Sequence, residues 1–153
     1  MKKYLTLLIT LCLLTLTGCS SGTGNNVNNS EDSQPIQIEI DGEVKEFSSS
    51  DNVIEIYNEN VVRNEKLYIN ANITCSGEIV DISISTKNLN IGNQNGNVEF
   101  ANIELDNGCI FIYNINNDDG RAFVEELNVG QQVTLNGTIG EISSTIKATG
   151  HFN

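Results

Sequence analysis

The chain has 153 residues, with 8 Lys or Arg against 20 Asp or Glu and a formal net charge of −12. This length is enough for one domain with a single small core. The acidity makes nucleic acid an unexpected partner, because affinity for it comes largely from Lys and Arg that neutralise phosphates. The cations beyond residue 18 are scattered along the chain as Lys45, Arg63, Lys66, Lys87, Arg121 and Lys147.

Residues 1–18 are predicted to be a signal peptide. Two lysines follow Met1, and residues 4–16 are almost wholly apolar, a run shorter than the roughly 20 residues that span a membrane. The sequence LTGC that ends at Cys19 resembles the lipobox of bacterial lipoproteins. The resemblance implies cleavage before Cys19, acylation of its thiol and a lipid anchor on the extracytoplasmic face of the cell membrane. The alternative is an ordinary secretory signal with an incidental cysteine.

Beyond the anchor, the chain divides into a linker and one domain. Residues 19–34 are rich in Ser, Gly and Asn and offer almost nothing to bury, which is typical of a flexible linker. Residues 35–153 are predicted to form the folded domain, including an N-terminal hairpin and helix. Residues 36–47 predict the hairpin, because apolar and polar residues alternate on both sides of Asp-Gly, a dipeptide that accepts a tight turn. Residues 48–51 offer helix N-caps, and the apolar spacing of residues 52–67 predicts one helix.

A bent strand is expected next. Residues 71–79 carry apolar or small side chains at odd positions, whereas Val80, Ile82 and Ile84 occupy even ones. Both sets can face inward only if a bulge or sharp bend lies between Gly77 and Val80. The Asn- and Gly-rich residues 85–97 predict a loop.

The remaining elements complete a small barrel. Residues 98–105 and 109–113 predict a second hairpin around a turn, and residues 121–127 predict a short helix. Residues 133–139 and 146–152 alternate as two further strands. The order indicates a mainly β fold, a five-stranded OB-fold Greek-key barrel with a preceding helix and a short helix between strands three and four.

Two stretches resemble the tRNA_anti-like OB-fold family of bacteria. Residues 57–79, YNENVVRNEKLYINANITCSGEI, are similar to a family helix with Tyr-x-x-Asn and a later Tyr before a first strand that ends in Gly. Residues 127–137, LNVGQQVTLNG, are similar to the start of strand four in the family. The resemblance covers about residues 50–153 and departs at Asn64, where members usually carry a small apolar residue. It implies an OB-fold and a nucleic-acid role, which the acidity of this chain opposes.

Catalytic and metal sites find little support in the sequence. The single histidine, His151, stands near the end of the chain, and there is no Gly-x-Ser-x-Gly, phosphate loop or His-Glu-x-x-His motif. Residues 114–120 have the composition of a calcium loop, but their register fails, because Asp119 occupies the sixth position if Asn114 is the first ligand. We predict a protein that is not an enzyme and that holds no cofactor or metal.

Cys75 and Cys109 are the cysteines of the predicted domain, and an exported protein permits a disulfide between them. In an OB barrel they would begin strands one and three. Along the sheet these strands lie two spacings of about 4.8 Å apart, which exceeds the limit of roughly 7 Å between the Cα atoms of bridged cysteines. Only an approach across the barrel could therefore join the two cysteines. A disulfide and two buried thiols therefore both stay open.

The sequence favours a surface-anchored binding or interaction module whose ligand, an unknown protein or envelope component, lies on strands two and three with residues 85–97. One alternative is an enzyme, or a subunit of one, acting on cell-envelope polymers, which requires two carboxylates that converge in a cleft. The other is a nucleic-acid-binding OB domain, which requires a basic groove and exposed aromatic side chains for stacking.

Overall fold

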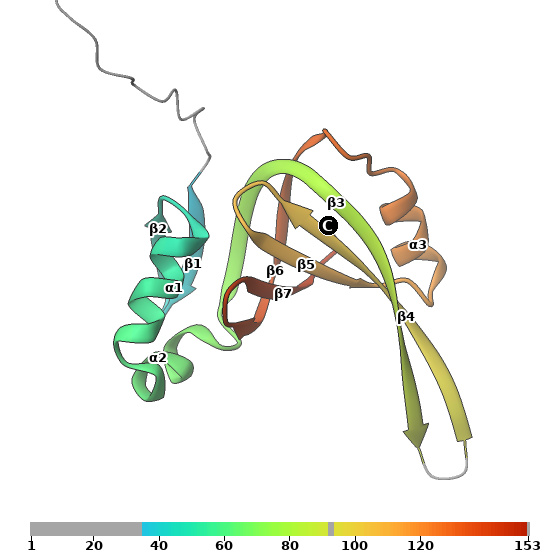
Figure 1. Ribbon diagram of the computed structural model, residues 1–153, viewed down its shortest axis with the longest axis horizontal. Coiled ribbons are helices and arrows are strands. Elements are labelled where there is room, and N and C mark those ends of the chain that lie inside the picture. The colour runs from blue at the N-terminus through green and yellow to red at the C-terminus, as the bar shows by residue number, and fades with distance from the viewer. Residues whose placement is uncertain (1–34, 92–93, 153) are drawn as a thin grey trace, which may run out of the picture.

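Strands dominate the computed structural model, which describes residues 35–91 and 94–152. Seven strands form one mixed sheet in the order β2-β1-β3-β4-β5-β7-β6, and β6 pairs back with β3, so five of them make a partly closed ring (Figure 1). The mainly β fold is therefore confirmed. The predicted signal peptide, Cys19 and the linker lie outside the described residues.

The strands are β1 (Ile36–Ile40), β2 (Glu43–Phe47), β3 (Asn72–Ile91), β4 (Gln94–Leu105), β5 (Cys109–Asn114), β6 (Gln132–Ile142) and β7 (Ile146–Gly150). The helices are α1 (Ser50–Glu59), α2 (Val61–Tyr68) and α3 (Asp118–Glu125). Within residues 35–91 and 94–152, no helix is long and apolar enough to cross a membrane.

The predicted N-terminal hairpin is confirmed. Strands β1 and β2 pair antiparallel, and Asp41 and Gly42 form the turn with φ of 54° and 79°. The hairpin does not stand alone, because β1 also pairs with the beginning of β3, where Gln37 lies opposite Thr74. It therefore extends the sheet beyond the ring.

One predicted helix is in fact two, so that prediction is wrong. Asn60 has a non-helical backbone, with φ −155° and ψ 80°, and its side-chain oxygen accepts a hydrogen bond from the Arg63 N–H at 3.1 Å. This side chain caps α2 and replaces the backbone bond that would have continued α1. Ser49, within the predicted capping segment, caps α1. The helices pack on the hairpin through three aromatic rings. The ring centroid of Tyr68 lies 6.3 Å from that of Phe47 and 6.2 Å from that of Tyr57.

Strand β3 bends through the middle of the molecule (Figure 1). Residues 72–78 pair with β6 and residues 79–91 pair with β4, and the register shifts between Ile79 and Asp81, which confirms the predicted bulge. The expectation that both apolar sets face inward is wrong for Val80 and Ile84, which are 46% and 57% exposed. Ile82, opposite Ile103, is partly buried against the core, so only part of the second set faces inward.

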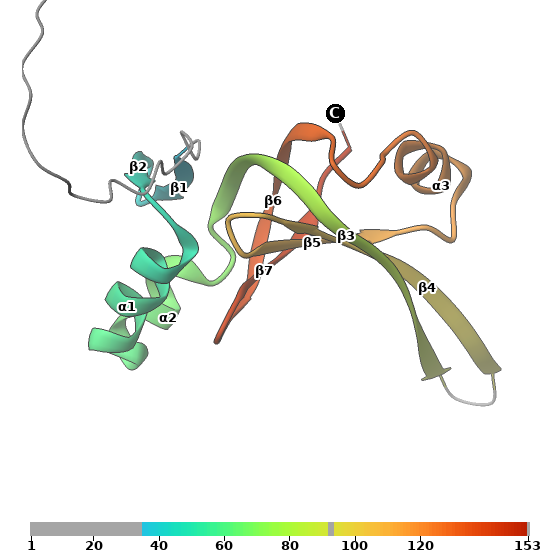
Figure 2. The ribbon, with the colours of Figure 1, turned by 45° about the horizontal axis from the view of Figure 1, so that its top comes forward.

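Residues 85–91 and 94–97 are paired strand, so the predicted loop over residues 85–97 is wrong for these positions. β3 continues to Ile91 and β4 begins at Gln94, with Ser85 opposite Phe100. The two strands form an arm that leaves the ring on the side opposite α1 and α2 (Figure 1), and Figure 2 shows the same separation from another direction. Cross-strand backbone hydrogen bonds hold such a ribbon without burying side chains, which explains why a polar composition typical of a loop occurs here in paired strands.

The last part of the chain closes the ring. β5 runs parallel to β7, with Cys109 opposite Ile146, and β7 runs antiparallel to β6. α3 begins at Asp118, earlier than the predicted 121, because the Asn117 side chain accepts a hydrogen bond from the Gly120 N–H and caps it there. The largest fully buried side chains of the ring include Ile73, Ile79, Ile103, Leu105, Phe111, Tyr113, Ile139 and Ile146.

Candidate functional site

A cavity of about 310 Å³ lies where β3, β4 and β5 run side by side. Strand alternation creates it, because Ala101 and Ile103 point into the core and are fully buried, whereas Phe100 and Asn102, which alternate with them, point to the other face. The residues that line this cavity, called here the β3–β5 cavity, are Ser85, Thr86, Lys87, Phe100, Asn102 and Ile112.

The β3–β5 cavity has an apolar part and a polar rim. Phe100 and Ile112 are half-buried, so each keeps some apolar surface in water. The side-chain amide of Asn102 donates a hydrogen bond to the Ser85 hydroxyl at 3.1 Å, which fixes the orientation of both groups. Lys87 is exposed and brings the positive charge of the cavity. An extended molecule with an apolar face and hydroxyl groups fits this arrangement.

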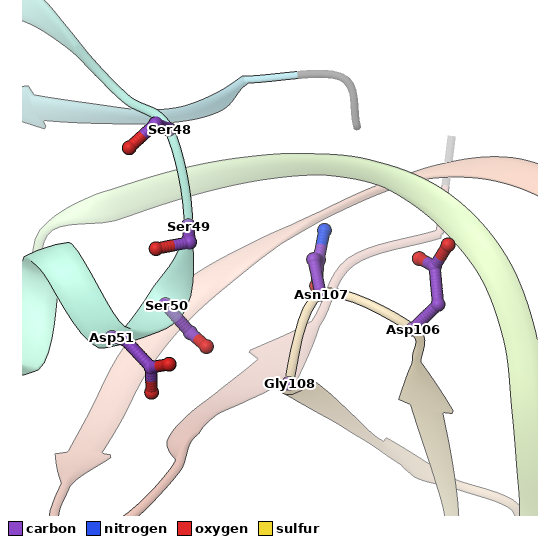
Figure 3. Close-up of a pocket in the computed structure, with 7 residues that line it drawn as sticks. All are labelled: Ser48, Ser49, Ser50, Asp51, Asp106, Asn107 and Gly108. Atoms are coloured by element: carbon purple, nitrogen blue, oxygen red, sulfur yellow. The ribbon is translucent and has the colours of Figure 1, made fainter. Parts of the chain in front are cut away.

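A second cavity, of about 330 Å³, lies between the start of α1 and the β4–β5 turn (Figure 3). Its lining residues are Ser48, Ser49, Ser50, Asp51, Asp106, Asn107 and Gly108. Several of these groups already have structural partners: the Ser49 hydroxyl accepts from the Asn52 N–H at 3.3 Å, and a carboxylate oxygen of Asp106 accepts from the Glu78 N–H at 3.1 Å.

The two carboxylates of this second cavity do not form a catalytic pair. Figure 3 shows the Asp106 carboxylate pointing toward β3 and the Asp51 carboxylate pointing away from it. In the part of the chain that the structure describes, no three His, Cys, Asp or Glu side chains gather as a metal site. The second cavity is therefore explained by helix capping and turn formation.

Cys75 and Cys109 meet in the interior of the ring, with their Sγ atoms 3.1 Å apart. Both thiols are buried, at 0% and 1% exposure. They approach each other across the ring, the one route that the sequence left open, because the bent β3 carries Cys75 over the start of β5. The hydrogen bond that Cys75 donates to Cys109, and then burial, raises the pKa of the Cys75 thiol well above its usual range.

The other residues considered from the sequence have structural roles. His151 is exposed, and its Nε2 lies 3.0 Å from the Thr138 hydroxyl. In the segment with a calcium-loop composition, Asn114 accepts a hydrogen bond from the Asn116 N–H, and Asn117 caps α3.

The predicted ligand surface, strands two and three with residues 85–97, includes the segment that carries Ser85, Thr86 and Lys87, but the sequence does not indicate which residues of those strands line a cavity. Phe100 and Ile112 stand at the opposite parity to their buried neighbours Ala101 and Phe111. Alternation thus separates the two faces, but it does not say which outward residues gather in a hollow. No protein-family model matches the chain, no curated protein is similar to it, and no solved structure matches it.

Proposed function

We propose that this protein is a lipid-anchored binding module of a bacterial cell envelope. In this proposal Cys19 carries the anchor, residues 19–34 act as the spacer, and the ring of strands is an OB-fold. The ligand is an uncharged glycan that occupies the β3–β5 cavity. That cavity is the observation on which the proposal rests.

The arrangement of the ring supports an OB-fold. Its strands follow the order β3-β4-β5-β7-β6, and β6 returns to pair with β3. Its first strand is bent, and α3 stands between its third and fourth strands. OB-folds bind oligonucleotides and oligosaccharides on the face of their second and third strands, which here correspond to β4 and β5.

The side chains of the β3–β5 cavity favour a sugar over a polyanion. Phe100 and Ile112 offer apolar surface for the C–H face of a sugar ring, and the side chains of Ser85, Thr86 and Asn102 can exchange hydrogen bonds with its hydroxyl groups. Lys87 is the one cation among the lining residues, and the chain as a whole carries a net charge of −12. That charge disfavours phosphate-bearing polymers.

The residues that line the β3–β5 cavity favour binding of a glycan over its hydrolysis. Glycosidases place two carboxyl groups on either side of the scissile bond. The residues that line the β3–β5 cavity include no Asp or Glu, and Asp51 and Asp106 line a different cavity without converging.

Calorimetric titration of soluble N-acetylglucosamine oligomers tests the ligand class. We expect the oligomers to bind, and Phe100→Ala to weaken binding by at least about tenfold, because the variant removes the main apolar surface of the cavity. Val62→Ala is the matched control, since Val62 is 75% exposed on α2, outside the cavity lining. Poly(glycerol phosphate) should not bind. An absence of oligomer binding, or equal losses in both variants, would contradict the glycan proposal.

Membrane fractionation tests the anchor. We expect Cys19→Ala to move the protein out of the membrane fraction without lowering its thermal unfolding midpoint, because the thiol accepts the lipid and the linker separates it from the folded domain. Unchanged membrane partitioning of this variant would contradict the lipoprotein assignment.

A further inference from the structure

The sulfur atoms of Cys75 and Cys109 lie close together inside the ring, near the distance of a covalent bond. The two Sγ atoms are 3.1 Å apart, about 1 Å more than the roughly 2.05 Å length of a disulfide. Cys75 and Cys109 are 34 positions apart in the sequence and lie on strands that are not neighbours, since β4 separates β3 from β5. Something in the fold must therefore bring them together.

Three hydrogen bonds between β3 and the β4–β5 turn do so. The Asp106 N–H donates to the Glu78 carbonyl at 2.9 Å, and the Glu78 N–H donates to the Asp106 carboxylate at 3.1 Å. The Asn107 side-chain amide donates to the Ser76 carbonyl at 3.1 Å. The bonded residues of β3 lie within three positions after Cys75, and those of the turn lie within three positions before Cys109, so the turn holds the two sulfurs in contact.

Gly77 makes this contact sterically allowed. A Cβ atom at residue 77 would collide with the Asp106 carboxylate oxygen, so a larger residue would have to displace that carboxylate from its hydrogen bond with the Glu78 N–H. The Asn107 side chain also accepts a hydrogen bond from the Cys109 N–H at 3.1 Å, which fixes the backbone at the start of β5. The pair is thus preorganised by the backbone on both sides.

We propose that Cys75 and Cys109 form a disulfide in the exported protein, a covalent bond between the bent strand and β5 across the interior of the ring. This inference rests on the export assigned under the proposed function, because extracytoplasmic compartments permit stable disulfides. The oxidant is a thiol–disulfide oxidoreductase of the envelope. One cysteine thiolate attacks the disulfide of this carrier, and the second displaces the carrier from the mixed disulfide. Two protons and two electrons leave the protein, and the carrier becomes a dithiol.

Burial dictates when this reaction takes place. The thiolate is the attacking form, and in the folded protein both thiols are inaccessible to a carrier. Oxidation therefore happens while the chain folds after export, before β5 and β7 close the interior. The completed bond constrains the unfolded chain between residues 75 and 109, a segment that includes the whole arm.

Differential alkylation of the full-length protein from its bacterial envelope tests the bond. Cells are quenched in acid, the protein is denatured, free thiols are blocked, the sample is reduced, and newly exposed thiols are labelled with a second reagent. We expect peptides containing Cys75 and Cys109 to carry only the second label. The same chain without residues 1–18, made in the cytoplasm, is the control, and its two thiols should carry the first label. First label on Cys75 and Cys109 of the envelope protein, or a disulfide between two chains, would overturn the inference.

The same experiment separates this inference from the proposed function. If the lipoprotein assignment alone fails, Cys19 carries the first label and the protein is soluble, while Cys75 and Cys109 still carry the second. Thermal unfolding gives an independent measurement. After reductive refolding, the midpoint of the envelope protein should fall by on the order of 10 °C. The Cys75→Ala/Cys109→Ala variant, which has no bond to lose, should show no shift with reductant, and an equal shift in both proteins would contradict the bond.

Discussion

At the scale of single residues, Asn64 shows how one buried polar side chain joins two helices. It is 2% exposed, and its amide donates to the carbonyls of Ile56 and Tyr57 at 2.6 and 3.2 Å. Those carbonyls belong to the last turn of α1, where no intrahelical donor remains. The position at which the chain departs from the tRNA_anti-like pattern is therefore the position that completes the end of α1.

Replacing Asn64 should be costly. We expect Asn64→Leu to lower the free energy of unfolding by about 2 kcal/mol, because it removes the side-chain donor from two carbonyls, one buried and one part-buried. Chemical denaturation of both proteins measures the difference. Asn58→Ala is the control, since Asn58 is exposed on α1, and it should change stability little. Equal effects of the two substitutions would show that the Asn64 bonds are not what stabilises this corner.

Tyr113 is a second buried polar residue, but its hydroxyl lacks a partner. Its ring is fully buried against Phe123 and Phe152, and among residues 35–91 and 94–152 its hydroxyl finds no hydrogen bond. Burial raises the pKa of Tyr113 from 10.0 to about 12. Below pH 10 the phenol is neutral in both states. Between pH 10 and about 12 the unfolded chain loses its proton while the folded chain keeps it, so stability falls as the pH rises.

Tyr113→Phe should therefore stabilise the protein. We expect a gain of about 1 kcal/mol at neutral pH, because the substitution removes an unpaired buried hydroxyl. We also expect a smaller alkaline loss, since the wild-type phenol contributes at most roughly 1.4 kcal/mol per pH unit in that window. Unfolding curves at pH 7 and pH 11, in the same thiol redox state, measure both effects. A variant as sensitive to alkali as the wild type would contradict this assignment; burial also raises the pKa of Tyr68, so some sensitivity should persist.

At the scale of elements, the contact between β3 and the β4–β5 turn depends on Gly77. We expect Gly77→Ala to destabilise the domain by about 1–3 kcal/mol, because the added Cβ collides with the Asp106 carboxylate and displaces the turn. Gly96→Ala is the matched control, since the arm offers open space at that position. Thermal unfolding of the two variants should separate them clearly. A silent Gly77→Ala would mean that the turn can shift without cost.

Elements with strong local signals could be predicted from the sequence. The Asp41-Gly42 turn and the alternation around it specified the hairpin, and the change of parity near Gly77 specified the bulge. The arm could not be predicted, because its strands pair through backbone groups that carry no side-chain signal. The break at Asn60 was hidden for a related reason, since apolar spacing continues from α1 into α2 while a capping side chain interrupts the backbone.

The candidate site was predictable only at the level of strands. Placing a ligand surface on strands two and three with residues 85–97 selected β4, β5 and the segment that holds Lys87, but that segment was expected to be a loop and is paired strand. The thiol pair shows the same limit. Counting strands along a sheet left only an approach across the barrel for Cys75 and Cys109, and the bend in β3, which the count could not evaluate, produces that approach.

At the scale of the whole molecule, charge and shape argue against nucleic acid despite the fold resemblance. Two of the cations are engaged in ion pairs, Arg121 with Glu99 at 3.0 Å and Lys147 with Glu141 at 3.1 Å. In the β3–β5 cavity, Lys87 is the cation and Phe100 is the aromatic residue. Sequence-independent binding of single strands needs a basic groove and several stacking platforms. One cation and one aromatic residue cannot supply a basic groove and several stacking platforms.

We therefore expect no appreciable binding of single-stranded DNA or RNA at physiological salt. Titrating labelled oligonucleotides of mixed sequence, first at low and then at physiological salt, measures this directly. Any weak association at low salt should disappear, because a phosphate contact made by few cations is lost as counterions compete. Micromolar or tighter affinity that survives the higher salt, and that Phe100→Ala or Lys87→Ala abolishes, would contradict the expectation. The β3–β5 cavity would then be a nucleotide-stacking site, because a net charge of −12 leaves stacking, rather than phosphate neutralisation, as the physical source of such affinity.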